Sequence, residues 1–462
     1  MSRRGAALAV AAAAAALGPA ACTGQIGTIA LDVVTAPGDD VLDRVDHVRL
    51  ILSNPYTVVE AERGADGHFD LELDVIADGP SGSILLLGYD ADDAIVAYGR
   101  TPPLPIAAID ADLRVYVAAP DTLAEAPVAL DAAVSEVGAG LLDYGVLLAG
   151  GRDATGAPVA DVVIYNAYGH ELQRGEDLPA PRAGVAVGTS TSGYAYVFGG
   201  TDADGDPRGT FWRFDTTIAP AGLWDEAADM PDLARAGAAM APLGGDAFLM
   251  TGAPPVLLEG LQLRATGFDD PTSLGGLPAS VQRTQDPGAP IYTLIVGDGA
   301  GPEGVMRLAD GALEAQSAPA DALRSHHALV TTADDRMIAI AGAGADAVPL
   351  RSAIVCDPAQ RSYTSRADVL TTGRLDAAVA ATATYILVAG GRDADGNVLG
   401  DAELLDPDTL AHLGTIPMVV PRTGAVARPL PNQQVLIAGG LDADGQPVDL
   451  LELYTPPPPD LP

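Results

Sequence analysis

The segments YILVAGGRDADGN (385–397) and QVLIAGGLDADGQ (434–446) have the same sequence pattern, and their first residues lie 434 − 385 = 49 positions apart. Each is an apolar run that ends in two glycines and continues into a short acidic turn. Five earlier apolar runs also end in glycine, so that the first glycines stand at positions 150, 199, 252, 297, 342, 390 and 439. Seven units of similar length are typical of a propeller or another array of structural repeats.

Two further features recur in register with these runs. A polar turn and a second strand-like stretch follow the glycines, and an arginine precedes the next apolar run, at Arg182, Arg235, Arg324, Arg374 and Arg422. Together these residues resemble the kelch repeat, whose family fold is a β-propeller of four-stranded blades. The resemblance implies an all-β fold with a seven-bladed kelch-type propeller over 119–455, in which the recurring glycines and arginines are structural. The family's Tyr-Asp pair is altered here to Tyr165-Asn166, Phe214-Asp215, Cys356-Asp357 and Leu405-Asp406, and its Trp remains at Trp224.

Physical reasons support the ring independently of the resemblance. Innermost strands converge on one axis, where main chains approach closely, and glycine also permits a positive φ in the turn that follows. The last unit stops at LLELYT, before the proline-rich tail 456–462, and leaves no room for a fourth strand. Because a ring must close, we expect residues 113–132 to supply that strand, through LRVYVAAPD or APVALDA. We also expect the arginines to pair with carbonyls or carboxylates between blades.

Residues 1–118 do not share the repeated pattern of the rest of the chain. Residues 1–22, MSRRGAALAVAAAAAALGPAAC, combine two arginines, an apolar stretch and small residues, which predicts a signal peptide. The segment resembles a bacterial lipoprotein signal, in which cleavage exposes a lipid-bearing cysteine, here Cys22. Pro19 stands where that pattern prefers Leu, so simple secretion stays open. Short alternating runs between turn clusters over 24–118 predict a small β-sandwich, similar to immunoglobulin-like modules.

The composition restricts the partners. The chain has 62 acidic and 25 basic residues, a formal charge of −37, and every basic residue is Arg. The lack of lysine excludes Schiff-base chemistry and the phosphate-binding loop that ends in Gly-Lys-Ser/Thr. Nucleic acids and anionic membranes require a basic face, so we expect neither as a partner, and membrane contact only through a lipid on Cys22. The expected location is outside the cytoplasm, in the cell envelope or secreted.

Acidic turns follow the glycines in four units, which are neighbours in a closed ring. They would form one arc at a propeller mouth, comprising Asp153, Asp202, Asp204, Asp206, Asp393, Asp395, Asp442 and Asp444. Asp and Asn favour tight turns for local reasons, and a rim that binds cations or a cationic partner is the alternative. Calcium takes six to eight oxygens, whereas one loop offers two or three carboxylates at most. We therefore expect no cofactor, with calcium as the open alternative.

Few other residues suggest chemistry. His326 and His327 are adjacent and would serve as base or ligand, although only one can face the axis on an alternating strand. Cys356 lies in the strand-like SAIVCDPA, which predicts a buried thiol. His47, His68, His170 and His412 are isolated, and the sequence assigns no catalytic residue.

These observations favour a binding or interaction scaffold that recognises a protein or a glycan through a propeller mouth, because loops on a rigid frame suit recognition. One alternative is an enzyme that acts on a sugar, of isomerase or lyase type, in which unique His, Arg and carboxylates converge at the mouth. Another is a calcium-dependent adhesive module.

Overall fold

The structure, a computed structural model, is built almost entirely of β-strands. It describes residues 26–460 except 28, 55, 65–74, 77–80, 105–110, 219–221, 252–254, 268–304, 310–311, 317–318, 320–321, 323, 345, 358–359 and 361. The helical elements in this part of the chain are two short 3-10 turns, η1 (Val41–Arg44) and η2 (Pro231–Leu233), and Ala322 also takes a 3-10 conformation. No described helix is long and apolar enough to cross a bilayer. Cys22 and the rest of the signal segment lie outside the described residues, so both stay predictions.

A six-stranded sheet forms the N-terminal region, in the order β2-β8-β7-β6-β3-β4. Its strands are β2 (Ile29–Val34), β3 (His47–Ser53), β4 (Tyr56–Glu62), β6 (Ile84–Tyr89), β7 (Ile95–Arg100) and β8 (Ala111–Ala118), and β1 (Ile26–Gly27) pairs with β5 (Val75–Ile76). β2 and β8 run parallel, while the other neighbours are antiparallel. The described residues give this sheet where the sequence predicts a sandwich, and the immunoglobulin-like resemblance stays a prediction.

Four-stranded antiparallel sheets make up most of the remainder, and five of them pair their strands in chain order. The first three are β10 (Gly138–Leu142), β11 (Gly145–Ala149), β12 (Val162–Asn166) and β13 (Glu171–Arg174); β14 (Ala186–Thr189), β15 (Tyr194–Phe198), β16 (Thr210–Asp215) and β17 (Leu223–Asp229); and β18 (Met240–Gly244), β19 (Ala247–Met250), β20 (Val256–Glu259) and β21 (Arg264–Thr266). Two later ones are β24 (Ser325–Thr331), β25 (Met337–Ala343), β26 (Ala353–Asp357) and β27 (Ser362–Arg366); and β28 (Ala378–Ala381), β29 (Ile386–Ala389), β30 (Asp401–Leu405) and β31 (His412–Pro417).

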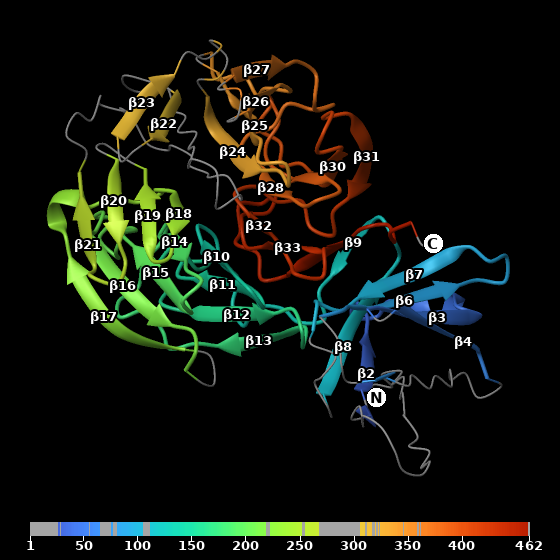
Figure 1. Ribbon diagram of the computed structural model, residues 1–462. Helices are drawn as coiled ribbons and strands as arrows, with labels where there is room; N and C mark the ends of the chain where they lie inside the picture. The colour runs from blue at the N-terminus through green and yellow to red at the C-terminus, as the bar shows by residue number, and fades with distance from the viewer. Residues whose placement is uncertain are drawn as a thin grey trace.

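The sheets are arranged about a common centre, as in a propeller (Figure 1). Their first strands are innermost, and β10 packs against β14, β14 against β18, and β24 against β28. A two-stranded hairpin of β22 (Val305–Ala309) and β23 (Ala312–Gln316) lies between the third sheet and the β24 sheet in the chain. The all-β, propeller-like fold is therefore confirmed. The number of seven blades stays a prediction, since much of 252–323 lies outside the described residues.

The last sheet closes the ring with a strand from upstream. It contains β32 (Val426–Pro429), β33 (Val435–Ala438), β34 (Glu452–Thr455) and, as its outermost strand, β9 (Thr122–Glu125). β9 runs antiparallel to β34, with Glu125 opposite Glu452. β32 packs in turn against β28 and β10. The predicted range 113–132 is confirmed, but the strand lies between the two segments named for it.

The recurring glycine and arginine form one contact between neighbouring sheets. Gly390 has φ 60°, and an added Cβ would lie 2.2 Å from the carbonyl oxygen of Arg422 in the next sheet. The N–H of Gly391 donates to the same oxygen over 2.8 Å, and two earlier units repeat this bond, from Gly151 to Arg182 and from Gly200 to Arg235. The predicted close approach of main chains is thus confirmed, at the join between sheets.

Where the last unit meets the first, a residue other than arginine supplies the carbonyl oxygen beside the glycine. A Cβ added to Gly439 would lie 3.0 Å from the carbonyl oxygen of Val134, at the start of the first sheet. Val134 stands one residue before Ser135, which pairs with Arg152 as Ala183 pairs with Thr201 in the following unit. Val134 therefore takes the position of Arg182, and the first and last units meet as the other neighbours do.

The arginine side chains act within their own sheets. Nη2 of Arg374 lies 2.6 Å from Oε1 of Glu403, both side chains are fully buried, and Glu403 also accepts from the N–H groups of Thr371 and Thr372. Arg422 and Glu452 repeat this pair at 2.6 Å. Carbonyls and carboxylates are the partners that the sequence predicts. The expectation that these side chains join different blades is wrong for these two pairs, because only the main-chain carbonyl of the arginine reaches the preceding sheet.

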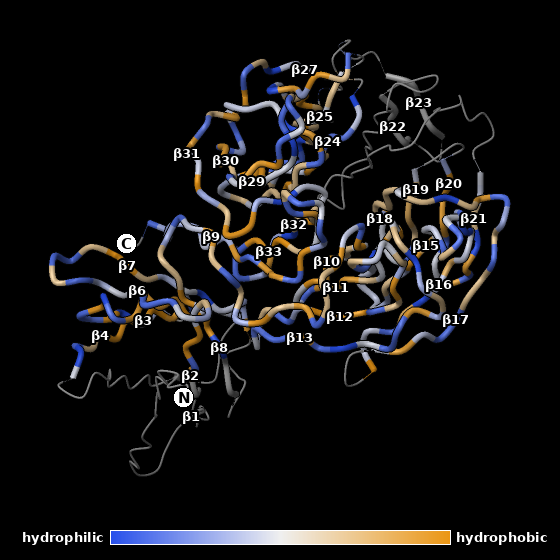
Figure 2. Tube along the Cα trace, turned by 180° about the vertical axis from the view of Figure 1, so that it is seen from behind, coloured by the Kyte–Doolittle hydropathy of each residue, from blue (hydrophilic) through white to orange (hydrophobic). Residues whose placement is uncertain are grey.

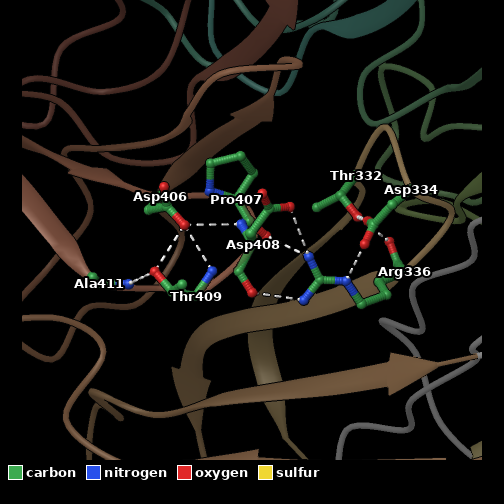
Figure 3. Close-up of polar contacts among 8 residues, drawn as sticks. All are labelled: Thr332, Asp334, Arg336, Asp406, Pro407, Asp408, Thr409 and Ala411. Atoms are coloured by element: carbon green, nitrogen blue, oxygen red, sulfur yellow. Dashed lines mark hydrogen bonds and ion pairs between the residues drawn. The ribbon is translucent and has the colours of Figure 1, made fainter.

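Other polar contacts join neighbouring sheets at the opposite end of the ring. Arg336, in the turn between β24 and β25, donates to the carbonyl oxygens of Pro407 and Asp408 and to Oδ1 of Asp408 (Figure 3). Asp406 holds the receiving turn by accepting from the N–H groups of Asp408 and Thr409. The residues at the altered Tyr-Asp positions thus stabilise the turns between third and fourth strands.

Apolar clusters fill the spaces between the sheets. One cluster combines Leu387 and Leu404 of one sheet with Ile437 of the next and Leu123 of β9. Hydrophobic residues gather inside the sheets, and hydrophilic ones are frequent in the outer turns (Figure 2). The N-terminal sheet contacts the first sheet through Tyr168, whose hydroxyl donates to the carbonyl oxygen of Pro103.

Candidate functional site

The acidic turns belong to the loops between second and third strands, at the end of the ring where the glycine pairs lie. In each loop the first aspartate accepts hydrogen bonds from main-chain N–H groups of its own turn. Asp153 accepts from Thr155 and Ala157, Asp202 from Asp204 and Asp206, Asp393 from Asp395 and Asn397, and Asp442 from Asp444 and Gln446. The hydroxyl of Thr155 also lowers the pKa of Asp153, and the amide of Asn397 lowers that of Asp393.

These bonds favour the local explanation of the acidic pattern. The first aspartate of each loop is half-buried and committed to the turn, while Asp204, Asp206, Asp395 and Asp444 are exposed. Among the described residues no three His, Cys, Asp or Glu side chains gather as metal ligands. Binding of calcium or a cationic partner by this arc stays a prediction. Thermal melting with calcium against a chelator tests it.

A second set of residues encircles the same end of the ring, two positions after each recurring arginine and, in the first unit, two positions after Val134. All have a positive φ, and main-chain hydrogen bonds link several of them in turn, from Gly184 to Glu136, Gly237 to Gly184, Asp376 to His326 and Gly424 to Asp376. We name this set the mouth ring; it comprises Glu136 (φ 51°), Gly184 (64°), Gly237 (68°), His326 (53°), Asp376 (52°) and Gly424 (66°).

Three of the six residues of the mouth ring are not glycine, although the backbone conformation at this position favours glycine. Glycine takes a left-handed conformation at little cost, and three units have it there. Glu136, His326 and Asp376 take the same conformation with side chains that disfavour it. Left-handed residues other than glycine also lie in ordinary turns of this protein, as at Asp335, but here three of them share one position of the repeat. Strained backbone of this kind is one mark of a functional site.

The side chains of these three residues form two charged groups. Nδ1 of His326 lies 2.7 Å from Oδ1 of Asp376, whose other oxygen contacts the guanidinium of Arg392. On the first unit, Nε of Arg152 donates to Oε2 of Glu136 over 3.0 Å, and its Nη2 donates to Oγ1 of Thr201 over 2.7 Å. Exposed side-chain fractions are 46 % for His326, 52 % for Glu136 and 42 % for Arg392, so solvent reaches both groups.

The sequence singled out only one member of this site. His326 was a candidate, and its neighbour His327 points elsewhere, into an environment whose burial lowers its pKa to about 3. Glu136, Arg152, Asp376 and Arg392 were missed. The sequence does contain a signal for two of the site residues. The second residue after the arginine is Gly in PRAG, ARAG and PRTG, but it is His in LRSHH and Asp in GRLD.

The remaining candidates are structural. Cys356 is buried and free, as predicted, and burial raises the pKa of its thiol to about 11. His170, which the sequence treats as isolated, is buried between the N-terminal sheet and the first sheet, where Nδ1 lies 2.8 Å from the hydroxyl of Tyr165. His68 lies outside the described residues.

Comparison with known proteins adds little. No family model matches the chain, and no curated protein matches it. Among solved structures the chain is similar to one titled "Structure of YjhT", with 12 % identity over 71 % of this chain and 96 % of that chain, and a TM-score of 0.46. The propeller-like fold therefore rests on the strands and contacts described above.

Proposed function

We propose that this chain is an exported, seven-bladed kelch-type propeller, tethered through a lipid on Cys22 or secreted, that binds a glycan through the mouth ring. The observation that carries the proposal is the left-handed conformation of Glu136, His326 and Asp376. The ion pairs of these side chains are open to solvent and add little to stability. Glycine takes the same conformation at less cost, so recognition is the better reason for the three residues.

The chemistry of the two groups suits hydroxyl-rich ligands. Arg152 and Arg392 offer N–H donors in a planar fork, while Glu136 and Asp376 offer acceptors beside them. A sugar ring presents adjacent hydroxyls that both donate and accept, and such pairs match them. Each cation is already neutralised by a carboxylate, which favours a polar ligand without strong net charge. A protein ligand with a polar contact surface is the alternative outcome.

Replacement by glycine tests the proposal without harming the fold. Glu136→Gly and Asp376→Gly restore the residue that other units use and remove the side chain, so the midpoint of thermal unfolding should stay or rise. Binding to an immobilised glycan panel should fall at least about ten-fold, as loss of a charge-assisted hydrogen bond implies. Asp335→Gly, at another left-handed position in the turn before β25, is the matched control. Unchanged glycan binding by both mouth variants would remove the proposal.

One observation favours a second candidate, an enzyme of isomerase or lyase type acting on a sugar. A carboxylate 2.7 Å from a histidine nitrogen holds the imidazole in one tautomer and orients it as a general base. His326 would then accept a proton from the sugar, and Asp376 would be its positioning residue. His326→Asn should abolish turnover while sugar binding persists, and NMR of mixed sugars with the wild-type protein measures that turnover. If the wild type binds the sugar but does not turn it over, the enzyme hypothesis is rejected and the binding scaffold is retained.

A further inference from the structure

Arg428 is the basic residue of the innermost strand β32, where the last sheet meets the first. Its Nη1 donates to the carbonyl oxygen of Ala427 over 2.9 Å, and its Nη2 donates to the carbonyl oxygen of Ala139 in β10 over 3.0 Å. The guanidinium thus bridges the innermost strands of the two sheets. Ala139 lies three residues beyond Glu136 in the chain, so the bridge lies near the mouth ring.

The charge of Arg428 has no carboxylate beside it among the described residues. The recurring arginines Arg374 and Arg422 each contact a buried glutamate, but both partners of Arg428 are neutral carbonyls. Burial lowers its pKa, with no opposing carboxylate. A half-buried cation without a counterion is partly desolvated, and a bound anion would relieve part of that cost.

Donors remain available for such an anion. A guanidinium carries five N–H groups, and the two carbonyls engage two of them. Nε of Arg428 makes neither carbonyl bond and is not a buried donor without a partner in the described part of the chain, and the side chain is half-buried, so solvent reaches part of the guanidinium. Leu141, two residues beyond Ala139 in β10, keeps 43 % of its surface exposed, which shows that solvent reaches this part of the inner wall.

We propose that Arg428 is a binding site for a small oxyanion, a carboxylate or a phosphate, on the inner wall of the ring. The free fork of the guanidinium matches two oxygens of such a group. The protein as a whole is strongly acidic, so an anion is held here only by local contacts, and the site selects anions small enough to reach the inner wall. This inference does not rest on the mouth ring or on the proposed glycan.

Calorimetric titration of the full-length protein with inorganic phosphate, acetate and glucuronate, against chloride at constant ionic strength, tests the site. At least one oxyanion should bind the wild type, and Arg428→Gln should weaken that binding about ten-fold or more. Arg366→Gln is the control, since Arg366 is exposed on the outermost strand β27 and its loss removes the same charge. Preference for glucuronate over acetate and phosphate identifies a sugar acid as the source of the anion, and preference for phosphate identifies a free ion.

A second readout separates binding from structural loss. The bridge to Ala139 also supports ring closure, so Arg428→Gln should melt earlier whatever binds. Oxyanion should raise the melting midpoint of the wild type and of Arg366→Gln but not that of Arg428→Gln. If Arg428→Gln fails to fold, Arg428→Lys keeps the charge without the fork and should bind more weakly. An equal anion effect in all variants, or none in the wild type, overturns the proposal.

Discussion

Replacing Gly390 by alanine should open the join between two sheets. The residue has φ 60°, which costs an alanine about 1–2 kcal/mol. Its Cβ would lie 2.2 Å from the carbonyl oxygen of Arg422, far inside contact distance, and main chain cannot rotate away as a side chain can. Forced overpacking of this kind costs about 1–3 kcal/mol more. We therefore expect Gly390→Ala to lower the free energy of unfolding by about 2–5 kcal/mol.

Gly396 isolates the second contribution. It lies six residues along the same loop with φ 83°, and a Cβ there would meet nothing within 4 Å. Gly396→Ala should cost only the conformational part, about 1–2 kcal/mol. Urea unfolding followed by tryptophan fluorescence and by circular dichroism measures both variants. Equal losses in the two variants would show that Arg422 does not press on Gly390, and the argument for glycine at the join would fail.

Three further predictions address burial, closure and pH. Glu403→Gln leaves the fully buried Arg374 without its counter-charge and should cost about 3–5 kcal/mol in urea unfolding; a loss below about 1 kcal/mol would contradict a buried pair. Leu123→Ala truncates a buried residue of β9 and should cost about 2–4 kcal/mol, whereas Leu413→Ala, at an exposed position, should change little. Burial and the charge of Arg114 lower the pKa of His170 to about 3, below the value of about 6.5 in an unfolded chain, so its contribution to stability is complete above about pH 6.5 and is lost as the pH falls toward 3. His170→Gln should therefore flatten the acid limb of stability by up to about 1.4 kcal/mol per pH unit, and an unchanged limb would refute this.

The sequence predicted the ring because its determinants recur. Glycines at one period, with an arginine in register, report a contact that every unit makes, and the missing last strand follows from counting. The strand itself, 122–125, was not separable from its flanks, because four residues carry too little alternation to distinguish them from the neighbouring segments.

The mouth ring was harder to predict because its signal is a departure from the repeat. A substitution at a glycine position causes backbone strain only if φ is positive there, and the sequence does not reveal φ. Asp376 and His326 are fifty residues apart and meet only because their sheets are neighbours. The acidic turns attracted attention through composition, yet their first carboxylates serve the local backbone.

The pairing of β9 with β34 has a consequence for the order of folding. Its partners are separated by 452 − 125 = 327 residues, so this contact must wait until nearly the whole propeller has left the ribosome. Contacts between such distant segments form slowly. Until then the edges of β9 and β34 lack their partners, and an unpaired strand edge is a template on which another chain pairs.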